Sequence, residues 1–447
     1  VIGYNAGTAI NTGGNNTLIG YQAGDAITTG GSNTAVGRDA LGSATDSSTN
    51  VAVGYGALRD NTGGTSNTAL GYLALEENIS GGRNLAVGFQ ALENPDTEND
   101  NLAVGYEALG GAIAGGEFNV AIGNYTLDAL TSGDTNVAIG YSAASGATTT
   151  TNSVYIGANV AATGVITGNQ NTVVGAESGT NLTGGNINSV LGAFALKDCT
   201  TGARHIAIGS DSLRYITTEN HNLGIGYQAL GSSSLSGANF NVAIGNNTGD
   251  AVTSGDENVL VGYNCSSNLT SGSGNVCYGS GAGNGLTTGA SNVFIGSNAG
   301  TGSSPGGNIT TSSNIITLGH SNIATANIQV DWTVASDKRD KTDVENVSIG
   351  LDFVNKLEPV TYRWDKRDNY SDAKPNGEHK ENWLDIGFLA QDVEELEKQY
   401  GYKFDDNTNL TTNLSEDGSK YGLQYSKFIP ILTKAVQELS AQVTTLQ

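Results

Sequence analysis

Methionine is absent from this sequence of 447 residues, and cysteine and proline are rare, with three and five copies. The cysteines Cys199, Cys265 and Cys277 are odd in number and lack the spacing of metal ligands, so they predict neither a disulfide framework nor a zinc site. We expect them to be small buried apolar residues. No run of about 18 apolar residues occurs, and we therefore expect no membrane insertion.

Basic residues are scarce over most of the chain. Residues 336–447 hold fourteen of them, and residues 1–335 hold only six, namely Arg38, Arg59, Arg83, Lys197, Arg204 and Arg214. Six cations can neutralise only a few phosphates, so nucleic acid is excluded as a partner. Anionic membrane surfaces are disfavoured for the same reason. The net charge of −23 favours solubility and weak self-association.

Glycine, by contrast, is abundant, with 64 copies, and many of them are regularly spaced. The phrase Asn50-Val51-Ala52-Val53-Gly54-Tyr55 recurs with variations along the chain. Its glycine recurs every 17 residues, with spacings of 18 or 19 at three places and 23 at the last. These glycines are Gly3, Gly20, Gly37, Gly54, Gly71, Gly88, Gly105, Gly123, Gly140, Gly157, Gly175, Gly192, Gly209, Gly226, Gly245, Gly262, Gly279, Gly296 and Gly319. A sustained period of this kind predicts a β-solenoid.

The residues within one repeat indicate how a coil is built. Val, Ile, Leu and Ala alternate in the phrase, as a half-buried strand requires, and the glycine marks a bend. We expect a second short strand in segments such as Gln90-Ala91-Leu92, and a turn rich in Gly, Ser, Thr and Asn to close the coil. A single coil buries little surface, so neighbouring coils must stack, and such chains gain by sharing a core in a homotrimer.

Two residue types recur at fixed positions in the repeat. Asparagine precedes the glycine by four residues from Asn16 to Asn292, except at Ser153 and His205, and Ile315 takes this place in the last repeat. We expect a hydrogen-bonded ladder that sets the register; the alternative is a row of sugar or ion ligands. Tyrosine often follows the glycine, and we favour a stacked column over a glycan platform. These residues are Tyr21, Tyr55, Tyr72, Tyr106, Tyr141, Tyr227 and Tyr263.

The phrase Asn-Val-Ala-Ile-Gly, intact at 136–140 and 241–245, resembles the repeat of trimeric autotransporter adhesin heads. The resemblance covers about 1–320. It implies a left-handed parallel β-roll in which three chains pack about one axis, and we expect a trimeric β-roll or β-solenoid shaft over 1–320 that is mostly β.

After residue 320 the composition changes, and we expect a neck at 321–335. Three ordered blocks follow: Ser-Asp-Lys-Arg-Asp-Lys-Thr-Asp-Val from Ser336, then Leu357–Trp364, then Ile386–Glu395. They resemble the intramolecular chaperone of endosialidase family, also called the S74 peptidase domain, over 336–447. The resemblance implies a C-terminal α+β domain of phage tail fibres and tailspikes. Such a domain trimerises, templates the β-structured fibre and releases itself by self-cleavage with a Ser–Lys dyad.

Carried over by position, the dyad falls on Ser336 and Lys341, and the cleaved bond on Ser336–Asp337. A neutral Lys341 amine would take the hydroxyl proton of Ser336 and allow attack on a carbonyl. A lysine becomes neutral near physiological pH only when burial disfavours its charge, and the flanking aspartates act against this. Attack on the Ala335 carbonyl or on another chain remains an alternative, because a serine attacking its own carbonyl forms a four-membered ring.

The end of the chain predicts a helix over 426–447. Its apolar residues are spaced 3, 4, 3, 4, 3 as in a heptad seam: Ile429, Leu432, Val436, Leu439, Val443 and Leu446. We favour a three-stranded coiled coil over a helix that packs on its own domain.

The function that we expect is the distal part of a trimeric phage tail fibre in the virion. Its partners would be a host surface receptor, a glycan or a protein, and other virion tail proteins; no cofactor is expected. A bacterial trimeric adhesin and a glycan-depolymerising tailspike are the alternatives. The carboxylates Glu93 and Glu98 suit the latter, but we expect them in a solvated loop. The chain opens inside a repeat, at Val1-Ile2-Gly3-Tyr4, so we expect a fragment.

Overall fold

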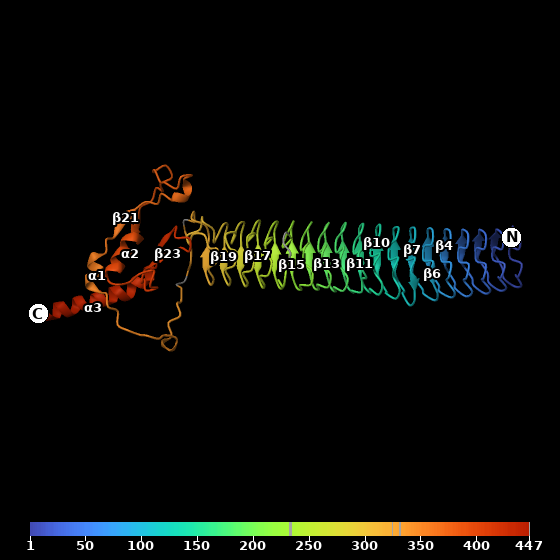
Figure 1. Cartoon of the computed structure of the whole chain (residues 1–447), viewed down its shortest axis with the longest axis horizontal. Helices are drawn as coiled ribbons and strands as arrows, with labels where there is room; N and C mark the ends of the chain where they lie inside the picture. Colours follow the sequence, from blue (N-terminus) through green and yellow to red (C-terminus); the bar gives the residue numbers. More distant parts are fainter. Residues whose placement is uncertain (232–234, 324, 330–331, 447) are drawn as a thin grey trace.

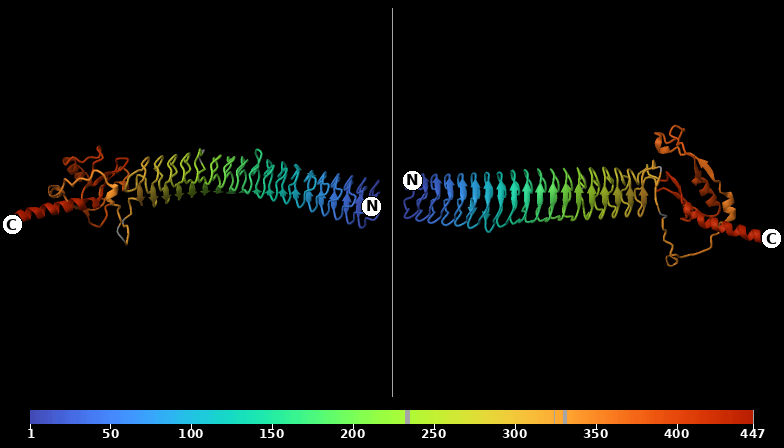
Figure 2. Two further views of the ribbon diagram at one scale, coloured as in Figure 1. Left: turned by 90° about the horizontal axis from the view of Figure 1, so that it is seen from below. Right: turned by 180° about the vertical axis from the view of Figure 1, so that it is seen from behind.

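A long rod and a smaller C-terminal domain at one end of it make up the molecule (Figures 1 and 2). The structure is a computed structural model that describes residues 1–231, 235–323, 325–329 and 332–446. Three residues of the predicted neck (324, 330 and 331) and the last residue of the predicted helix, 447, lie outside the described residues. Among the described residues, no helix is both long and apolar enough to cross a membrane.

The rod is a stack of coils whose strands form one 18-stranded sheet. Each strand pairs in parallel with the strand of the next coil at the same repeat position, as Ala52 does with Ala69. This confirms the predicted β-solenoid. The strands are β1 Thr17–Ile19, β2 Thr34–Val36, β3 Val51–Val53, β4 Thr68–Leu70, β5 Leu85–Val87, β7 Leu102–Val104, β9 Val120–Ile122, β10 Val137–Ile139, β11 Val154–Ile156, β12 Thr172–Val174, β13 Ser189–Leu191, β14 Ile206–Ile208, β15 Leu223–Ile225, β16 Val242–Ile244, β17 Val259–Val261, β18 Val276–Tyr278, β19 Val293–Ile295 and β20 Ile316–Leu318.

The second segment of the repeat is a turn, so the expectation of two strands per coil is wrong. Gln90 and Leu92 both adopt left-handed backbone, with φ of 50° and 47°, and alternating left-handed residues cannot extend into a strand. The segment still stacks on the next coil, because the Leu92 N–H donates to the Ala108 carbonyl at 2.9 Å. Among the residues that the structure describes, a second strand forms only at β6 Asn94–Pro95 and β8 Ala112–Ile113, which pair with each other.

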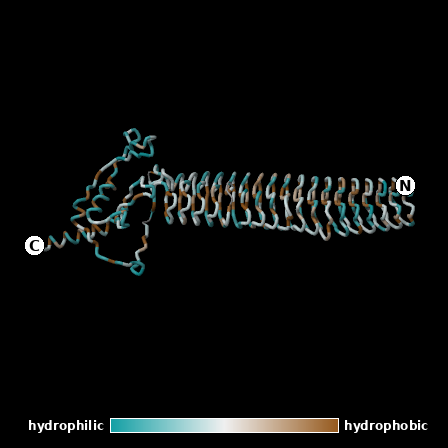
Figure 3. The backbone as a smooth tube through the Cα atoms, viewed as in Figure 1, coloured by the Kyte–Doolittle hydropathy of each residue, from teal (hydrophilic) through white to brown (hydrophobic). Residues whose placement is uncertain are grey.

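The core of the rod is narrow and runs its full length, with apolar residues recurring in every coil (Figure 3). The middle residue of each strand points inward, and it is most often alanine. At Leu18 and Phe294, where a larger residue takes this place, the facing turn carries glycine: a Cβ on Gly24 would lie 2.9 Å from Leu18, and one on Gly300 would lie 2.9 Å from Phe294. Large and small residues thus complement each other at a constant coil width. The three cysteines are buried, as expected.

Asparagine side chains form the predicted ladder inside the rod. The side-chain oxygen of Asn33 accepts from the Asn50 N–H at 2.9 Å, and the Asn50 side-chain amide donates to the Gly64 carbonyl at 2.9 Å. The backbone N–H of Ser153 and that of His205 each donate to the preceding asparagine in the same way. Because these side chains are buried and engaged with the backbone, the ladder sets the register of the coils.

The aromatic residues after the glycine stack on the surface of the rod. Ring centroids lie 5.1 Å apart for Tyr55 and Tyr72, 5.1 Å for Tyr72 and Phe89, and 4.9 Å for Phe89 and Tyr106. Arg38 fills one position of the column, with its guanidinium 5.4 Å from the ring of Tyr21 and 5.6 Å from that of Tyr55. A stacked column is therefore present.

Two lengthened coils are supported by a buried carboxylate. Glu98 is only 3% exposed, and it accepts from the Thr97 N–H at 2.9 Å and the Gly115 N–H at 2.7 Å. Glu219 accepts from the Gly237 N–H at 3.0 Å in an equivalent arrangement. The expectation that Glu98 lies in a solvated loop is wrong, because the longer turn needs an acceptor for its amides.

The C-terminal domain combines three α-helices with two antiparallel strand pairs. Its elements are η1 Lys338–Asp340, α1 Leu351–Lys356, β21 Val360–Tyr362, η2 Arg367–Asn369, β22 Asp385–Gly387, α2 Ala390–Gln399, β23 Thr412–Leu414, β24 Tyr421–Leu423, η3 Tyr425–Lys427 and α3 Phe428–Leu446. Phe353, Leu396 and Ile431 form its core. Glu397 on α2 is buried and accepts from the N–H and hydroxyl of Thr411 at 2.7 Å each, which fixes the β23–β24 hairpin on the helix.

Candidate functional site

The two predicted dyad residues lie in the long excursion between β20 and α1 (Figures 1 and 2). The short helix η1 bends the chain here. The Asp337 carboxylate caps this turn by accepting from the Arg339 N–H at 2.9 Å, and the Lys341 N–H donates to the Lys338 carbonyl at 3.3 Å. The turn therefore brings residues 336 and 341 to the same side of the chain.

Ser336 and Lys341 are in direct contact. The Nζ of Lys341 donates to the Oγ of Ser336 at 2.6 Å. A nucleophile and its base must lie within hydrogen-bond distance, and this pair does. With the amine neutral, the same contact runs in reverse, and the hydroxyl passes its proton to Nζ as Oγ attacks a carbonyl. The structure brings the two residues together, while their catalytic role stays a prediction.

The aspartate that follows Ser336 in the chain forms an ion pair with an arginine. Asp337 forms an ion pair with Arg339, with 2.6 Å between Nη2 and Oδ2. Hydrogen bonds from the Arg339 side chain and backbone hold the pKa of the Asp337 carboxyl below its usual range. One of the aspartates that flank the dyad is thus directed toward a cation other than Lys341.

Both dyad side chains are exposed in the single chain. Burial is one way in which a lysine is made neutral near physiological pH, and neither side chain of the pair is buried here. Catalysis by this pair through burial would therefore require a cover that the single chain does not supply. Both candidate bonds adjoin Ser336, and attack on the Ala335 carbonyl passes through a five-membered ring.

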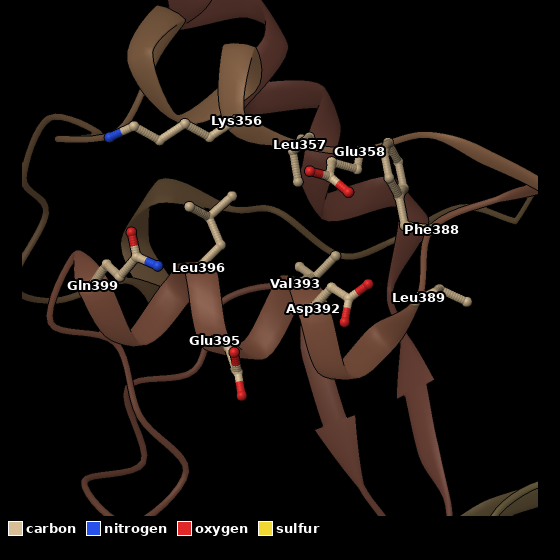
Figure 4. Close-up of a pocket in the computed structure, with 10 residues that line it drawn as sticks. All are labelled: Lys356, Leu357, Glu358, Phe388, Leu389, Asp392, Val393, Glu395, Leu396 and Gln399. Carbon is tan, nitrogen blue, oxygen red and sulfur yellow. The ribbon is translucent and has the colours of Figure 1, made fainter.

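A cleft of about 450 Å³ lies between the end of α1 and the helix α2 (Figure 4). Leu357, Leu389 and Leu396 contribute apolar surface, and Glu358 and Asp392 add carboxylates at its edge. The dyad residues are not part of its lining. Within the parts of the chain that the structure describes, no group of three or more His, Cys, Asp or Glu could hold a metal ion.

Sequence reasoning missed two carboxylates in the turn of the β23–β24 hairpin. Glu416 and Asp417 contact the last coil of the shaft, about a hundred residues earlier in the chain. No periodic pattern marks them, and the only signal is the dipeptide Glu-Asp followed by Gly418, which indicates a turn.

Comparison with known proteins bears on the C-terminal region. No curated protein sequence matches this chain. A family match begins at the predicted dyad serine, which agrees with the resemblance that the three ordered blocks indicate. Residues 336–409 match the family described as chaperone of endosialidase, Peptidase S74. The region that follows the β-solenoid in the sequence is therefore similar to an intramolecular chaperone.

Proposed function

We propose that this chain is the distal part of a trimeric phage tail fibre that attaches the virion to its host. In this proposal the C-terminal domain assembles three chains, starts the winding of the β-solenoid and then releases itself by cleavage at Ser336. The arrangement of a repetitive shaft before a chaperone-like domain supports it.

The observation that carries the trimer is the division of α3 into two apolar faces. Phe428, Ile431 and Ala435 are buried against the helix's own domain. The heptad seam is a different set and remains exposed: Ile429, Leu432, Val436, Leu439, Val443 and Leu446. Since the intramolecular contact uses other residues, the seam is available for two further copies of the helix.

The shaft offers a matching apolar stripe. The residue just before the motif glycine points away from the core of the coil, and it is apolar in every strand of the sheet. Many of these side chains are more than a third exposed: Ile19, Leu70, Ile122, Leu191, Ile208, Ile244, Ile295 and Leu318. An apolar stripe of this length, with most of its other members half-buried, is typical of a surface that packs against other chains.

Assembly also supplies what the dyad lacks. In a trimer, the neighbouring chains can cover the exposed excursion and disfavour the charge on Lys341, so cleavage follows folding. Release of the chaperone then leaves a stable shaft for host attachment. The fibre binds a host surface glycan or protein, and other virion tail proteins anchor it.

Light scattering on the full-length chain tests the trimer. We expect a trimer for the wild type and its loss in the seam variant Val436→Lys/Leu439→Lys, because buried like charges oppose helix association. The matched control is Gln437→Lys/Ser440→Lys, which adds the same charge at exposed positions outside the seam and should leave the trimer intact. A monomeric wild type, or a seam variant that assembles like the control, would contradict the proposal.

A further inference from the structure

The turn of the β23–β24 hairpin is seated on the last coil of the shaft. One carboxylate oxygen of Glu416 accepts from the Thr311 N–H at 3.0 Å and the Thr311 hydroxyl at 2.6 Å, and also from the Thr310 hydroxyl at 2.9 Å. The other oxygen accepts from the Thr310 N–H at 3.0 Å and the Ser312 N–H at 3.3 Å. A single carboxylate thus satisfies five donors of the shaft.

Asp417 has a different part in this contact. One of its oxygens accepts from the Asn308 N–H at 3.1 Å. The other holds the hairpin turn itself, through the Ser415 hydroxyl at 2.6 Å and the Ser419 N–H at 3.0 Å. Glu416 therefore serves mainly the shaft, whereas Asp417 also keeps the hairpin in shape.

The donors exist because the stack of coils ends here. Inside the shaft, each coil donates to the next at this position: the Thr270 N–H bonds to the Thr287 carbonyl, and the Thr287 N–H bonds to the Thr310 carbonyl, at 2.8 Å each. Thr310 has no further coil above it, and Glu416 takes the place of the missing carbonyl. The end of a β-solenoid leaves such amides unpaired unless something covers them.

The electrostatics show that these neutral donors suit an anion. Burial opposes the ionisation of Glu416, but hydrogen bonds from Thr311 and Thr310 outweigh it and lower its pKa to about 2. Lys420 is a cation of the hairpin itself, and it donates to the Ser304 carbonyl of the shaft at 3.1 Å. The hairpin carries its own charges, so its removal leaves a set of neutral donors on the shaft.

We propose that release of the chaperone opens a carboxylate-binding site at this end of the shaft, formed by Asn308, Thr310, Thr311 and Ser312, and that its ligand is a carboxylated sugar of a host surface glycan. The inference rests on the proposed function, in which residues 337–447 leave. The hydroxyl and amide side chains of the site can form hydrogen bonds with the hydroxyls of a sugar. None of the four residues offers the exposed apolar anchor with which a peptide ligand is usually held.

The test uses the shaft that the full-length chain produces by self-cleavage. A labelled peptide of residues 412–423, read by fluorescence anisotropy, should bind this shaft. Trigalacturonate should displace the peptide, and the neutral galactose trisaccharide of the same linkage should not. Thr311→Val should weaken both ligands about tenfold, because it removes a hydrogen bond to a charged group. The matched control is Thr288→Val, the exposed residue at the same position one coil earlier.

The inference is supported if trigalacturonate displaces the peptide and the neutral trisaccharide does not. Failure of the peptide to bind would overturn the site, and binding of the peptide without displacement by trigalacturonate would overturn the sugar ligand in favour of an acidic protein.

A second arm separates this inference from the self-cleavage on which it builds. In the uncut Ser336→Ala chain, Glu416→Ala vacates the donors while Asp417 keeps the turn. Galacturonate should then bind, as seen by ligand-observed NMR, and Ser336→Ala alone should not bind it. If the wild type never cleaves but Glu416→Ala binds galacturonate, the site stands and the release mechanism fails. If galacturonate does not bind the Ser336→Ala/Glu416→Ala chain either, the site itself is contradicted.

Discussion

His205 takes the place of an asparagine in the ladder and bonds to Asn222 of the next coil. Its Nδ1 accepts from the Asn222 N–H at 3.3 Å, and its Nε2 donates to the Glu219 carbonyl at 2.8 Å. These two bonds copy the pair that each asparagine makes, and they require the neutral imidazole. Burial lowers the pKa of His205 to about 4.

The shaft should therefore lose stability in mild acid through this one residue. The unfolded chain protonates His205 near pH 6.5, whereas the folded chain does so only near pH 4, so the unfolded state binds more protons between these values. The loss of unfolding free energy should approach about 3 kcal/mol per chain near pH 4. His205→Asn should remove this pH dependence, as measured by chemical unfolding at pH 7 and pH 4.5. Equal pH dependence in both chains would contradict the account.

The motif glycines should not tolerate a side chain. Gly54 has φ of 141°, and a Cβ there would lie 2.1 Å from the Gly71 carbonyl oxygen of the next coil. Gly54→Ala should destabilise the shaft by at least about 1–3 kcal/mol, as read from thermal unfolding followed by circular dichroism. Gly63→Ala is the matched control, since nothing lies within 4 Å of that position and its φ is not positive; it should change stability by less than about 1 kcal/mol. Similar effects of the two changes would count against the close stacking of coils.

The sequence predicts the repeat unit much better than its detailed shape. The spacing of Gly54 and its equivalents predicts the solenoid, and the position of Asn50 predicts the ladder, because both depend on local patterns that recur. The turn at Leu92 could not be predicted, since leucine rarely adopts left-handed backbone on its own. There the stacking of coils outweighs the local preference.

Deletion of residues 336–447 should prevent soluble fibre from forming, while a mature shaft should stay stable without them. Parallel strands in separate coils pair only after the chains are in register, and this step is slow and prone to aggregation without a nucleus. Glu416 accepts from the Thr310 and Thr311 N–H groups, so the last coil can pair with the chaperone before other coils have formed. Soluble yield and sedimentation of the truncated chain measure this effect. A truncated gene that gives as much soluble trimer as the full-length gene would contradict the chaperone role.

The candidate site was predicted only in part. Ser336 and Lys341 are close in sequence, and the turn that joins them makes their contact a local property of the chain. The contact between Glu416 and Thr311 joins distant segments, and it follows from the end of the coil stack rather than from any motif. In the proposed trimer, what covers the dyad depends on neighbouring chains, which a single sequence does not place.

Replacing either dyad residue should stop self-cleavage without unfolding the trimer. Ser336→Ala removes the nucleophile and Lys341→Ala removes the base, and both side chains are exposed, so neither change removes a core contact. Lys341→Arg should fail as well, because a guanidinium is not a base near neutral pH. Light scattering on each variant checks that the trimer persists.

Intact-mass spectrometry of the purified wild type and of Ser336→Ala tests the central claim most directly. We predict that the wild type separates into residues 1–336 and 337–447, or at the adjacent Ala335–Ser336 bond, and that the variant stays whole. A wild-type trimer that remains uncut for days at physiological pH, or a cut that persists in Ser336→Ala, would contradict self-cleavage by this dyad.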